Sequence, residues 1–285
     1  MKGMNDMDKT KVWFITGAGR GMGTTIAKAA LNAGHKVVAT GRNPDAVVRA
    51  IGDSENVMVV PLDVCEPADA HAAVKAAIER FGAIDVLVNN AAHFCGGYFE
   101  ELTPDQIEHQ LQVALVGSMH VTRAILPVMR TQRSGHVISI SSGAGISGFE
   151  YNSAYSAAKF ALEGWMEALA PEVAPFGIHT TIVNPGFFRT EFLTDASSTF
   201  AKPSIEDYDD RRAGHLEFFN NQNGQQPGDP KKLANALLQI ANEAQPPQRF
   251  IAGADAIDIA EQKIANLQTE INAYRDLSKS MAYDN

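Results

Sequence analysis

Three residues of the sequence, Ser142, Tyr155 and Lys159, have the types and spacing needed to move a proton. Tyr155 and Lys159 are four positions apart, so on a helix they lie on one face. A free tyrosine has a pKa of about 10, and a neighbouring ammonium favours its phenolate form, so Lys159 is expected to lower the pKa of Tyr155. Ser142 would hydrogen-bond the same substrate oxygen. The three residues suit proton exchange with a carbonyl or an alcohol, although the same tyrosine–lysine spacing also occurs in ordinary helix-surface pairs.

A glycine-rich turn follows the first apolar run of the chain. Residues 12–16 read VWFIT, which is typical of a buried parallel strand, and GAGRGMG follows before an amphipathic helix. Backbone N–H groups and the positive end of the helix dipole then face one point, where an anion can bind. Such a turn can also be purely structural. In the strand–turn–helix context we predict dinucleotide binding by Gly17, Gly19, Arg20, Gly21, Met22 and Gly23.

The end of the second predicted strand, residues 35–40, bears on which dinucleotide binds. An NAD site usually has an acid here that holds the 2′-hydroxyl of the ribose. This chain has Gly41 and Arg42 instead. Arg42, helped by Arg20, could pair with a 2′-phosphate, so the sequence favours NADP(H) over NAD(H). The alternative is that both arginines are only solvated.

Strands and helices alternate along the rest of the chain. Further strands are predicted at residues 57–62, 84–89, 136–141, 178–184 and 249–251, and helices at 67–81, 103–126, 153–173, 230–242 and 255–277. This alternation predicts an α/β fold with a doubly wound, mostly parallel sheet and helices on both faces. We expect one domain over residues 11–285, a loose tail at 1–10, and a substrate-covering insertion with short helices at 191–229.

Composition and charge narrow the classes of function. The chain has 285 residues, 45% of them hydrophobic, and a formal net charge of −9 without a basic run, which argues against a nucleic-acid partner. We expect no membrane-spanning segment and no secretion signal, hence a cytoplasmic protein. Cys65 and Cys95 are expected to be free thiols, and the eight histidines show no paired spacing for a metal site.

The motifs together resemble those of the short-chain dehydrogenase/reductase family over nearly the whole chain. They occur in family order: residues 16–23 for TGxxxGxG, 89–92 for NNAG, Ser142, Tyr155 with Lys159, and 185–186 with Thr190. The resemblance implies a Rossmann-like sheet, a nicotinamide cofactor, and reversible hydride transfer between a carbonyl and an alcohol. It also implies that Tyr155 is the general acid/base, that Ser142 holds the substrate oxygen, and that Lys159 binds the nicotinamide ribose.

The resemblance assigns further residues to the cofactor. Asn90 and Ala91 would lie near it, and residues 182–190 would close over the nicotinamide and its phosphates. Within that segment the expected contacts are Pro185, Gly186 and Thr190. Asp63 and Val64 follow the third strand, where Asp63 could accept a bond from adenine or cap a loop. The family usually forms dimers or tetramers through helices near 104–127 and 153–173, so a homodimer or homotetramer is expected.

Two residues depart from the family pattern. Ala92 replaces the glycine of NNAG, which is a small change. Ala114 stands where the family usually has an asparagine, thought to anchor a water in the proton relay behind the lysine. An alanine side chain cannot hydrogen-bond a water. This predicts slower turnover or a substitute group, and it motivates a second hypothesis, an NADP(H)-binding sensor or interaction protein with weakened catalysis.

Aromatic residues follow several of the predicted strands on the substrate side. His93 and Phe94 come after the fourth strand, and Phe187 and Phe188 come after the sixth. If they converge, they form an apolar pocket with an aromatic wall. This favours a bulky hydrophobic ketone or alcohol as the small-molecule substrate, rather than a sugar. The alternative is that several of these phenylalanines belong to the core.

Overall fold

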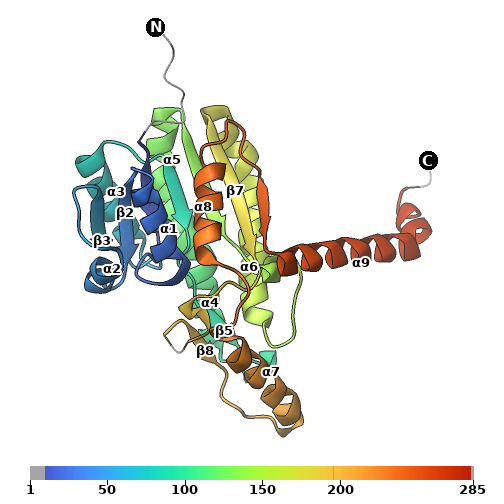
Figure 1. The fold of residues 1–285 in the computed structure, drawn as a ribbon. Helices are drawn as coiled ribbons and strands as arrows, with labels where there is room; N and C mark the ends of the chain where they lie inside the picture. Colours follow the sequence, from blue (N-terminus) through green and yellow to red (C-terminus); the bar gives the residue numbers. More distant parts are fainter. Residues whose placement is uncertain (1–9, 195, 284–285) are drawn as a thin grey trace.

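The computed structural model describes residues 10–194 and 196–283 of the chain. Its main element is a seven-stranded sheet with the strand order β3-β2-β1-β4-β6-β7-β9 (Figure 1). All neighbouring strands in this sheet run parallel. The strands are β1 (Val12–Ile15), β2 (Lys36–Gly41), β3 (Val57–Pro61), β4 (Val86–Asn89), β6 (Gly135–Ile140), β7 (Ile178–Pro185) and β9 (Arg249–Ala252).

Helices cover both faces of this sheet, which confirms the predicted doubly wound, Rossmann-like fold (Figure 1). One apolar cluster receives residues from α1, α2 and α8, and the other from α3, α5 and α6. The helices are α1 (Gly21–Asn32), α2 (Pro44–Ile51), α3 (Pro67–Phe81), α4 (Pro104–Leu111), α5 (Gly117–Gln132), α6 (Ser153–Val173), α7 (Asp209–Gln222), α8 (Pro230–Ile240) and α9 (Ala254–Lys279).

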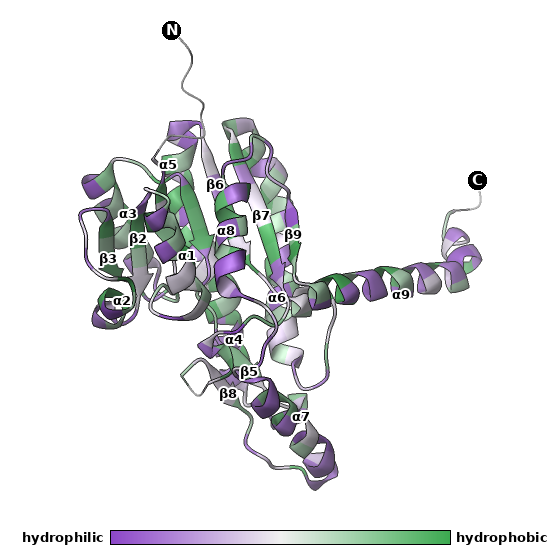
Figure 2. Ribbon diagram, in the orientation of Figure 1, coloured by the Kyte–Doolittle hydropathy of each residue, from purple (hydrophilic) through white to green (hydrophobic). Residues whose placement is uncertain are grey.

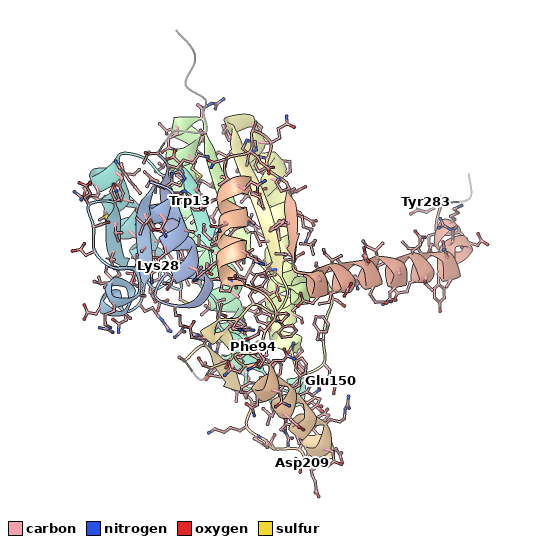
Figure 3. The ribbon with its side chains drawn as sticks, viewed as in Figure 1. Trp13, Lys28, Phe94, Glu150, Asp209 and Tyr283 are labelled. Atoms are coloured by element: carbon pink, nitrogen blue, oxygen red, sulfur yellow. The ribbon has the colours of Figure 1, made fainter. Side chains whose placement is uncertain are left out.

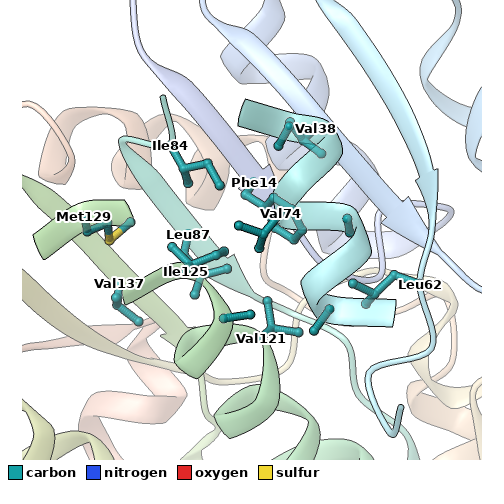
Figure 4. Close-up of a cluster of buried hydrophobic side chains, with 14 of the residues drawn as sticks. Phe14, Val38, Leu62, Val74, Ile84, Leu87, Val121, Ile125, Met129 and Val137 are labelled. Carbon is teal, nitrogen blue, oxygen red and sulfur yellow. The ribbon is translucent and has the colours of Figure 1, made fainter. Parts of the chain in front are cut away.

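Strand β1 is apolar along its whole length because both of its faces are covered. Successive side chains of a strand point to opposite faces. In β1, Val12 and Phe14 accordingly join the cluster under α3 and α5, whereas Trp13 and Ile15 join the cluster under α1 and α8. Figure 4 shows the cluster under α3 and α5, with Phe14 between the helices and the sheet. Figure 2 shows the central strands as the hydrophobic interior.

Some elements differ from the sequence-based prediction. Helix α2 and a separate two-stranded sheet, formed by β5 (Phe94–Gly96) and β8 (Ser198–Phe200), are not predicted from the sequence. The expected insertion at 191–229 contains β8 and α7, so part of it is one helix of 14 residues. The predicted tail at 1–10 lies outside the described residues except for its last position.

The helix predicted from residue 103 begins as expected but is interrupted. Thr103 accepts a hydrogen bond from the Gln106 N–H, and the Gln106 side chain accepts one from the Thr103 N–H, a capping box that fixes the start of α4. A π-helical turn, η3 (Gln112–Val116), then separates α4 from α5. Extra residues of this kind in a helix are frequent at functional sites.

The same stretch bears on the expectation that no segment could span a membrane. The continuous helical region Pro104–Gln132 is long and apolar enough to do so by length and composition alone, so that expectation was too strict. Its buried residues, among them Val121, Ile125 and Met129, pack in the cluster shared with α3 and the sheet. That packing is typical of a core helix, which satisfies the same composition test.

His136 in β6 makes the stability of the fold depend on pH. Its ring is 6% exposed, and Nε2 lies 2.8 Å from Oγ1 of Thr181. Burial, with smaller contributions from the charges of His179 and Lys11, lowers the pKa of His136 from 6.5 to about 3. Below pH 6.5 the unfolded chain therefore binds a proton that the folded chain does not, and stability is lost as the pH falls towards 3.

We expect His136→Gln to reduce this acid sensitivity. Between pH 7 and pH 5, His136 should lower the free energy of unfolding of the wild type by about 2 kcal/mol. The variant should lack this contribution, so its free energy of unfolding should decrease by that much less. Urea unfolding followed by circular dichroism at the two pH values measures it. The exposed His71→Gln is the control. An equal pH dependence in His136→Gln and wild type would contradict the assignment.

Candidate active site

One cleft of about 770 Å³ opens at the carboxyl ends of the parallel strands. Ligands of open α/β sheets bind at this edge, outside the point where the strand order reverses, here between β1 and β4. Every residue predicted to bind cofactor or substrate, or to act in catalysis, lines this cleft except Gly23. They are Gly17, Gly19, Arg20, Gly21, Met22, Arg42, Asp63, Val64, Asn90, Ala91, His93, Phe94, Ser142, Tyr155, Lys159, Pro185, Gly186, Phe187, Phe188 and Thr190.

The glycine turn between β1 and α1 is shaped by its conformation and by Asn90. Gly17 and Gly21 have φ values of 65° and 58°, a left-handed region that glycine tolerates best. The Asn90 side chain donates to the carbonyl oxygens of Thr16 at 2.9 Å and Gly17 at 3.2 Å, which ties the turn to the end of β4. A Cβ atom at Gly23 would lie 2.4 Å from the Gly17 carbonyl oxygen, so Gly23 allows close helix–strand packing.

The N-terminus of α1 donates a hydrogen bond to a carboxylate oxygen in this structure. The backbone N–H of Gly21 donates to Oε2 of Glu191 at 3.1 Å, from the segment that follows β7. A carboxylate in this position shows that the N–H points into the cleft and favours negative charge. The turn therefore fits a dinucleotide phosphate. Glu191 was not selected from the sequence. Its carboxylate has to leave the Gly21 N–H before a phosphate can accept a hydrogen bond from that group.

Arg42 and Arg20 stand at the end of the cleft where the adenosine ribose is expected. Both side chains are exposed, and neither forms an ion pair within the described parts of the chain. Asn43 caps α2 by accepting a hydrogen bond from the Ala46 N–H at 3.1 Å, and this fixes the backbone next to Arg42. Both guanidinium groups are thus available to a ligand.

The three residues predicted to transfer a proton come together beyond the end of β6. Tyr155 and Lys159 lie on α6, are 7% and 2% exposed, and the ammonium Nζ is 5.6 Å from the centre of the tyrosine ring. Lys159 donates to the carbonyl oxygen of Ile140 at 2.8 Å. Ser142 follows β6 and hydrogen-bonds Tyr155. The predicted serine, tyrosine and lysine therefore form one contiguous group.

The expected direction of the tyrosine shift is wrong for this structure. Burial raises the pKa of Tyr155 to about 12, and the hydrogen bond from Ser142 opposes this only in part. Burial also lowers the pKa of Lys159 to about 8, against the charge of Glu163. The cost of removing the charged phenolate from water exceeds the gain from the Ser142 hydrogen bond. Tyr155 consequently keeps its proton at neutral pH, which suits it to act as an acid.

Glu163 is a buried residue at the site that the sequence analysis missed. It lies one turn after Lys159 on α6, is 6% exposed, and accepts hydrogen bonds from Ser141 Oγ at 2.6 Å and Arg249 Nη1 at 2.5 Å. Asn184 donates to the same carboxylate and to the carbonyl oxygen of Ser142 at 3.0 Å. The Tyr–x₃–Lys–x₃–Glu spacing signals a shared face, but its partners come from distant strands.

Asp255 at the start of α9 was missed for a similar reason. Its carboxylate accepts a hydrogen bond from the Phe187 N–H at 2.7 Å. A Cβ atom at Gly186 would lie 2.1 Å from this carboxylate, so glycine is needed there for the close approach. Asp255 thereby holds the loop after β7, which carries predicted cofactor and substrate contacts.

Ala114 lies in η3, the irregular turn between α4 and α5. It is 1% exposed, and its carbonyl oxygen accepts a hydrogen bond from Ser118 at 3.3 Å. The turn packs against α6, and Val113 next to Ala114 lines the cleft. The departure from the family pattern therefore falls beside the helix that carries Tyr155 and Lys159.

An aromatic cluster forms the substrate end of the cleft. Phe94 packs edge-on against Tyr155 with ring centres 5.3 Å apart, and also contacts rings from the insertion. Those rings are Phe192, Phe200 and Phe219. Figure 3 shows Phe94 between the sheet and α7. Phe187 packs against Phe218 at 5.9 Å, and His93 lies 2.9 Å from Thr199 in β8.

The sequence and the fold both match known proteins. A family model described as short chain dehydrogenase matches residues 11–200. Oxidoreductase BOA17 of Botryotinia fuckeliana is 37% identical over 96% of this chain and 100% of its own length. A 3-ketodihydrosphingosine reductase of Bacteroides thetaiotaomicron is 36% identical over 85% of this chain and 88% of its own.

Solved structures show the same architecture. A short-chain dehydrogenase from Streptomyces avermitilis superposes with a TM-score of 0.87 at 36% identity, covering 96% of this chain and 100% of that one. A short-chain dehydrogenase/reductase from Burkholderia phymatum, solved with NAD, has a TM-score of 0.80 at 22% identity, covering 93% and 96% of the two chains. At 22% identity, the similarity to the Burkholderia phymatum structure shows a shared fold.

We expect Glu191→Gln to tighten cofactor binding. The variant removes a negative charge from the N-terminus of α1, where it competes with a phosphate, a change worth about 1 kcal/mol or about fivefold in the dissociation constant. Fluorescence titration with NADPH measures it. Glu206→Gln, an exposed change in the same insertion, is the control. An unchanged or weaker affinity in Glu191→Gln would show that Glu191 does not compete for this site.

Proposed function

Since this chain belongs to the short-chain dehydrogenase/reductase family, we propose that it is an NADP(H)-dependent oxidoreductase that interconverts a carbonyl and a secondary alcohol on a hydrophobic substrate. Membership of the family makes it an oxidoreductase that uses a nicotinamide dinucleotide. The preference for NADP(H), the hydrophobic substrate and the residue roles are the proposal. The observation that carries it is the group Ser142, Tyr155 and Lys159, which shares one cleft with the glycine turn.

Proton transfer is assigned to Tyr155. A bound nicotinamide would supply or accept the hydride. Tyr155, with its pKa raised to about 12, holds a proton at neutral pH and donates it to the substrate oxygen during reduction. Ser142 hydrogen-bonds that oxygen where negative charge develops. Lys159 is positively charged below its pKa of about 8 and stabilises the phenolate that Tyr155 becomes.

The preference for NADP(H) rests on charge at the end of β2. Arg42 and Arg20 line the cleft there and have no ion-pair partner among the described residues. A guanidinium binds a phosphate through parallel hydrogen bonds. No acid stands at the tip of β2 to hold a free 2′-hydroxyl.

The hydrophobic substrate is inferred from the aromatic cluster around Tyr155. Phe94 packs directly on the tyrosine ring, and rings from the insertion cover it. A substrate carbonyl that reaches Tyr155 must therefore place its substituents against apolar surface. A relative is named as a reductase of 3-ketodihydrosphingosine, which is a ketone by its name. We propose a bulky apolar ketone, or the matching alcohol, as the substrate class.

A second candidate function is a cofactor-binding sensor with weakened catalysis. Ala114 favours it, because this position lies beside α6 and its side chain cannot hold a relay water. Against it stand the paired, buried Tyr155 and Lys159, since a pure binder has no chemical need for either. Expected assembly through α4, α5 and α6, and a cytoplasmic location, remain proposals for both candidates.

Turnover should depend on Tyr155. We expect the wild-type protein to oxidise NADPH when given apolar ketones, and Tyr155→Phe to lower kcat by at least about 100-fold, because the proton donor is lost. NADPH affinity should stay the same, since phenylalanine keeps the packing on Phe94. Absorbance of the reduced cofactor and fluorescence titration measure the two. Binding of NADPH without turnover on any ketone by the wild type would instead support the sensor.

Cofactor preference should depend on Arg42. Arg42→Asp removes the phosphate partner and adds an acid for a 2′-hydroxyl, so the ratio of NADPH to NADH affinity should fall by about tenfold or more. Titration with both cofactors measures it. Arg80→Asp, the same change of charge on α3, is the control. If Arg42→Asp leaves the ratio unchanged, the charge argument fails while the oxidoreductase assignment stands.

A further inference from the structure

The last helix, α9, leaves the body of the protein and projects as an arm (Figure 1). Only its first turns are attached, through buried Ala256 and the Asp255 carboxylate. Every described residue from 264 to 283 is exposed. The surface of the arm includes large apolar side chains, which are 44–66% exposed. These are Ile257, Ile264, Leu267, Ile271, Tyr274 and Leu277.

The apolar residues of the arm follow a seven-residue repeat. Isoleucines recur at 257, 264 and 271, and a second series, Ala260, Leu267 and Tyr274, lies three residues after each isoleucine. Figure 2 shows the resulting alternation of green and purple along α9. A strict repeat of 3.5 residues is the seam of a coiled coil, and it is narrower than the apolar face of a helix that packs on its own domain. The pattern indicates a partner helix.

We propose that α9 pairs with α9 of a second copy of this chain as an antiparallel coiled coil. In an antiparallel pair, the residues that flank the seam on a given side of one helix face the residues that flank it on the same side of the other helix. With Ile264 packed on Leu267 of the second copy, Glu261 faces Arg275 of that copy. Lys263 then faces Glu270 on the other side of the seam. The two-fold axis repeats each contact, so all eight charges are paired.

The charges favour this register over a parallel one. A parallel coil would pair Glu270 with Arg275 but place Lys263 opposite Gln268, leaving half of the flanking charges without a partner. None of Glu261, Lys263, Glu270 and Arg275 forms an ion pair within the described chain. The antiparallel register also sets Ile257 at the base of one arm against Tyr274 near the end of the other, so the seam from Ile257 to Tyr274 is covered along its length.

A membrane surface is a poorer match for the same stripe. Helices that lie on anionic bilayers are usually rich in lysine and arginine on their polar face. The sequence of α9 has five acidic and three basic residues, a net charge of −2 (3 − 5). The stripe is also separate from α4, α5 and α6, where family-type assembly is expected. The arm therefore adds an interface of its own.

The first test is the mass of the assembly. Leu267→Asp places a charge in the centre of the seam, and we expect it to halve the mass measured by light scattering after size exclusion. Thr269→Asp puts the same charge on the opposite face and should leave the mass unchanged. NADPH titration of both variants checks that the body is intact, because neither residue lines the cleft. An unchanged mass for Leu267→Asp would overturn the proposal.

The second test is the direction of pairing. Glu261→Arg should weaken the assembly, and adding Arg275→Glu should restore it only in the antiparallel register. A short bis-maleimide should join two copies of Gln268→Cys, because this residue faces itself across the antiparallel axis, whereas Tyr274→Cys would be joined only in a parallel coil. Cross-linking at 274 and not at 268 would overturn the antiparallel assignment. So would a monomeric wild type whose arm binds phosphatidylserine vesicles.

Discussion

A sheet whose strands all run parallel brings every carboxyl end to one edge, and the site depends on this constraint. Residues that follow β1, β2, β4, β6 and β7 therefore meet in one cleft although they are far apart in the sequence. Hydrogen bonds between these strand ends hold the arrangement. Asn90 donates to carbonyl oxygens at the end of β1, and Asn184 donates to the carbonyl oxygen of Ser142. Without the common edge, Ser142, Tyr155 and Lys159 would not share a cleft with the glycine turn.

The second constraint is the burial of charge behind that edge. Lys159 and Glu163 are both nearly inaccessible on α6, and buried charges persist only when they are paired or hydrogen-bonded. The carbonyl oxygen of Ile140 accepts a hydrogen bond from Lys159. The Glu163 carboxylate accepts hydrogen bonds from Ser141, Asn184 and Arg249. The same burial sets the protonation of the site, because it favours the neutral tyrosine and opposes the charged lysine.

Residues whose role depends on near neighbours could be selected from the sequence. The glycine turn and the Tyr155–Lys159 pair carry their signal within a few positions, and the structure places them in the cleft. Glu191 and Asp255 could not be selected, because each acts on a backbone N–H more than 60 positions away. The pKa of Tyr155 was misjudged, since the lysine is a local feature but burial is a property of the whole fold.

By itself the sequence determined the alternation of strands and helices, the glycine turn before α1, and the placement of Tyr155 and Lys159 on one helix face. Periodicity and spacing are enough for these, because strand, turn and helix are local conformations. The tertiary structure decided how deeply each group is buried, which distant partner it meets, and where the apolar stripe of α9 faces. The seven-residue repeat of α9 can be read in the sequence, but the exposure of its apolar residues depends on where the helix lies relative to the sheet, so only the fold shows that they face solvent.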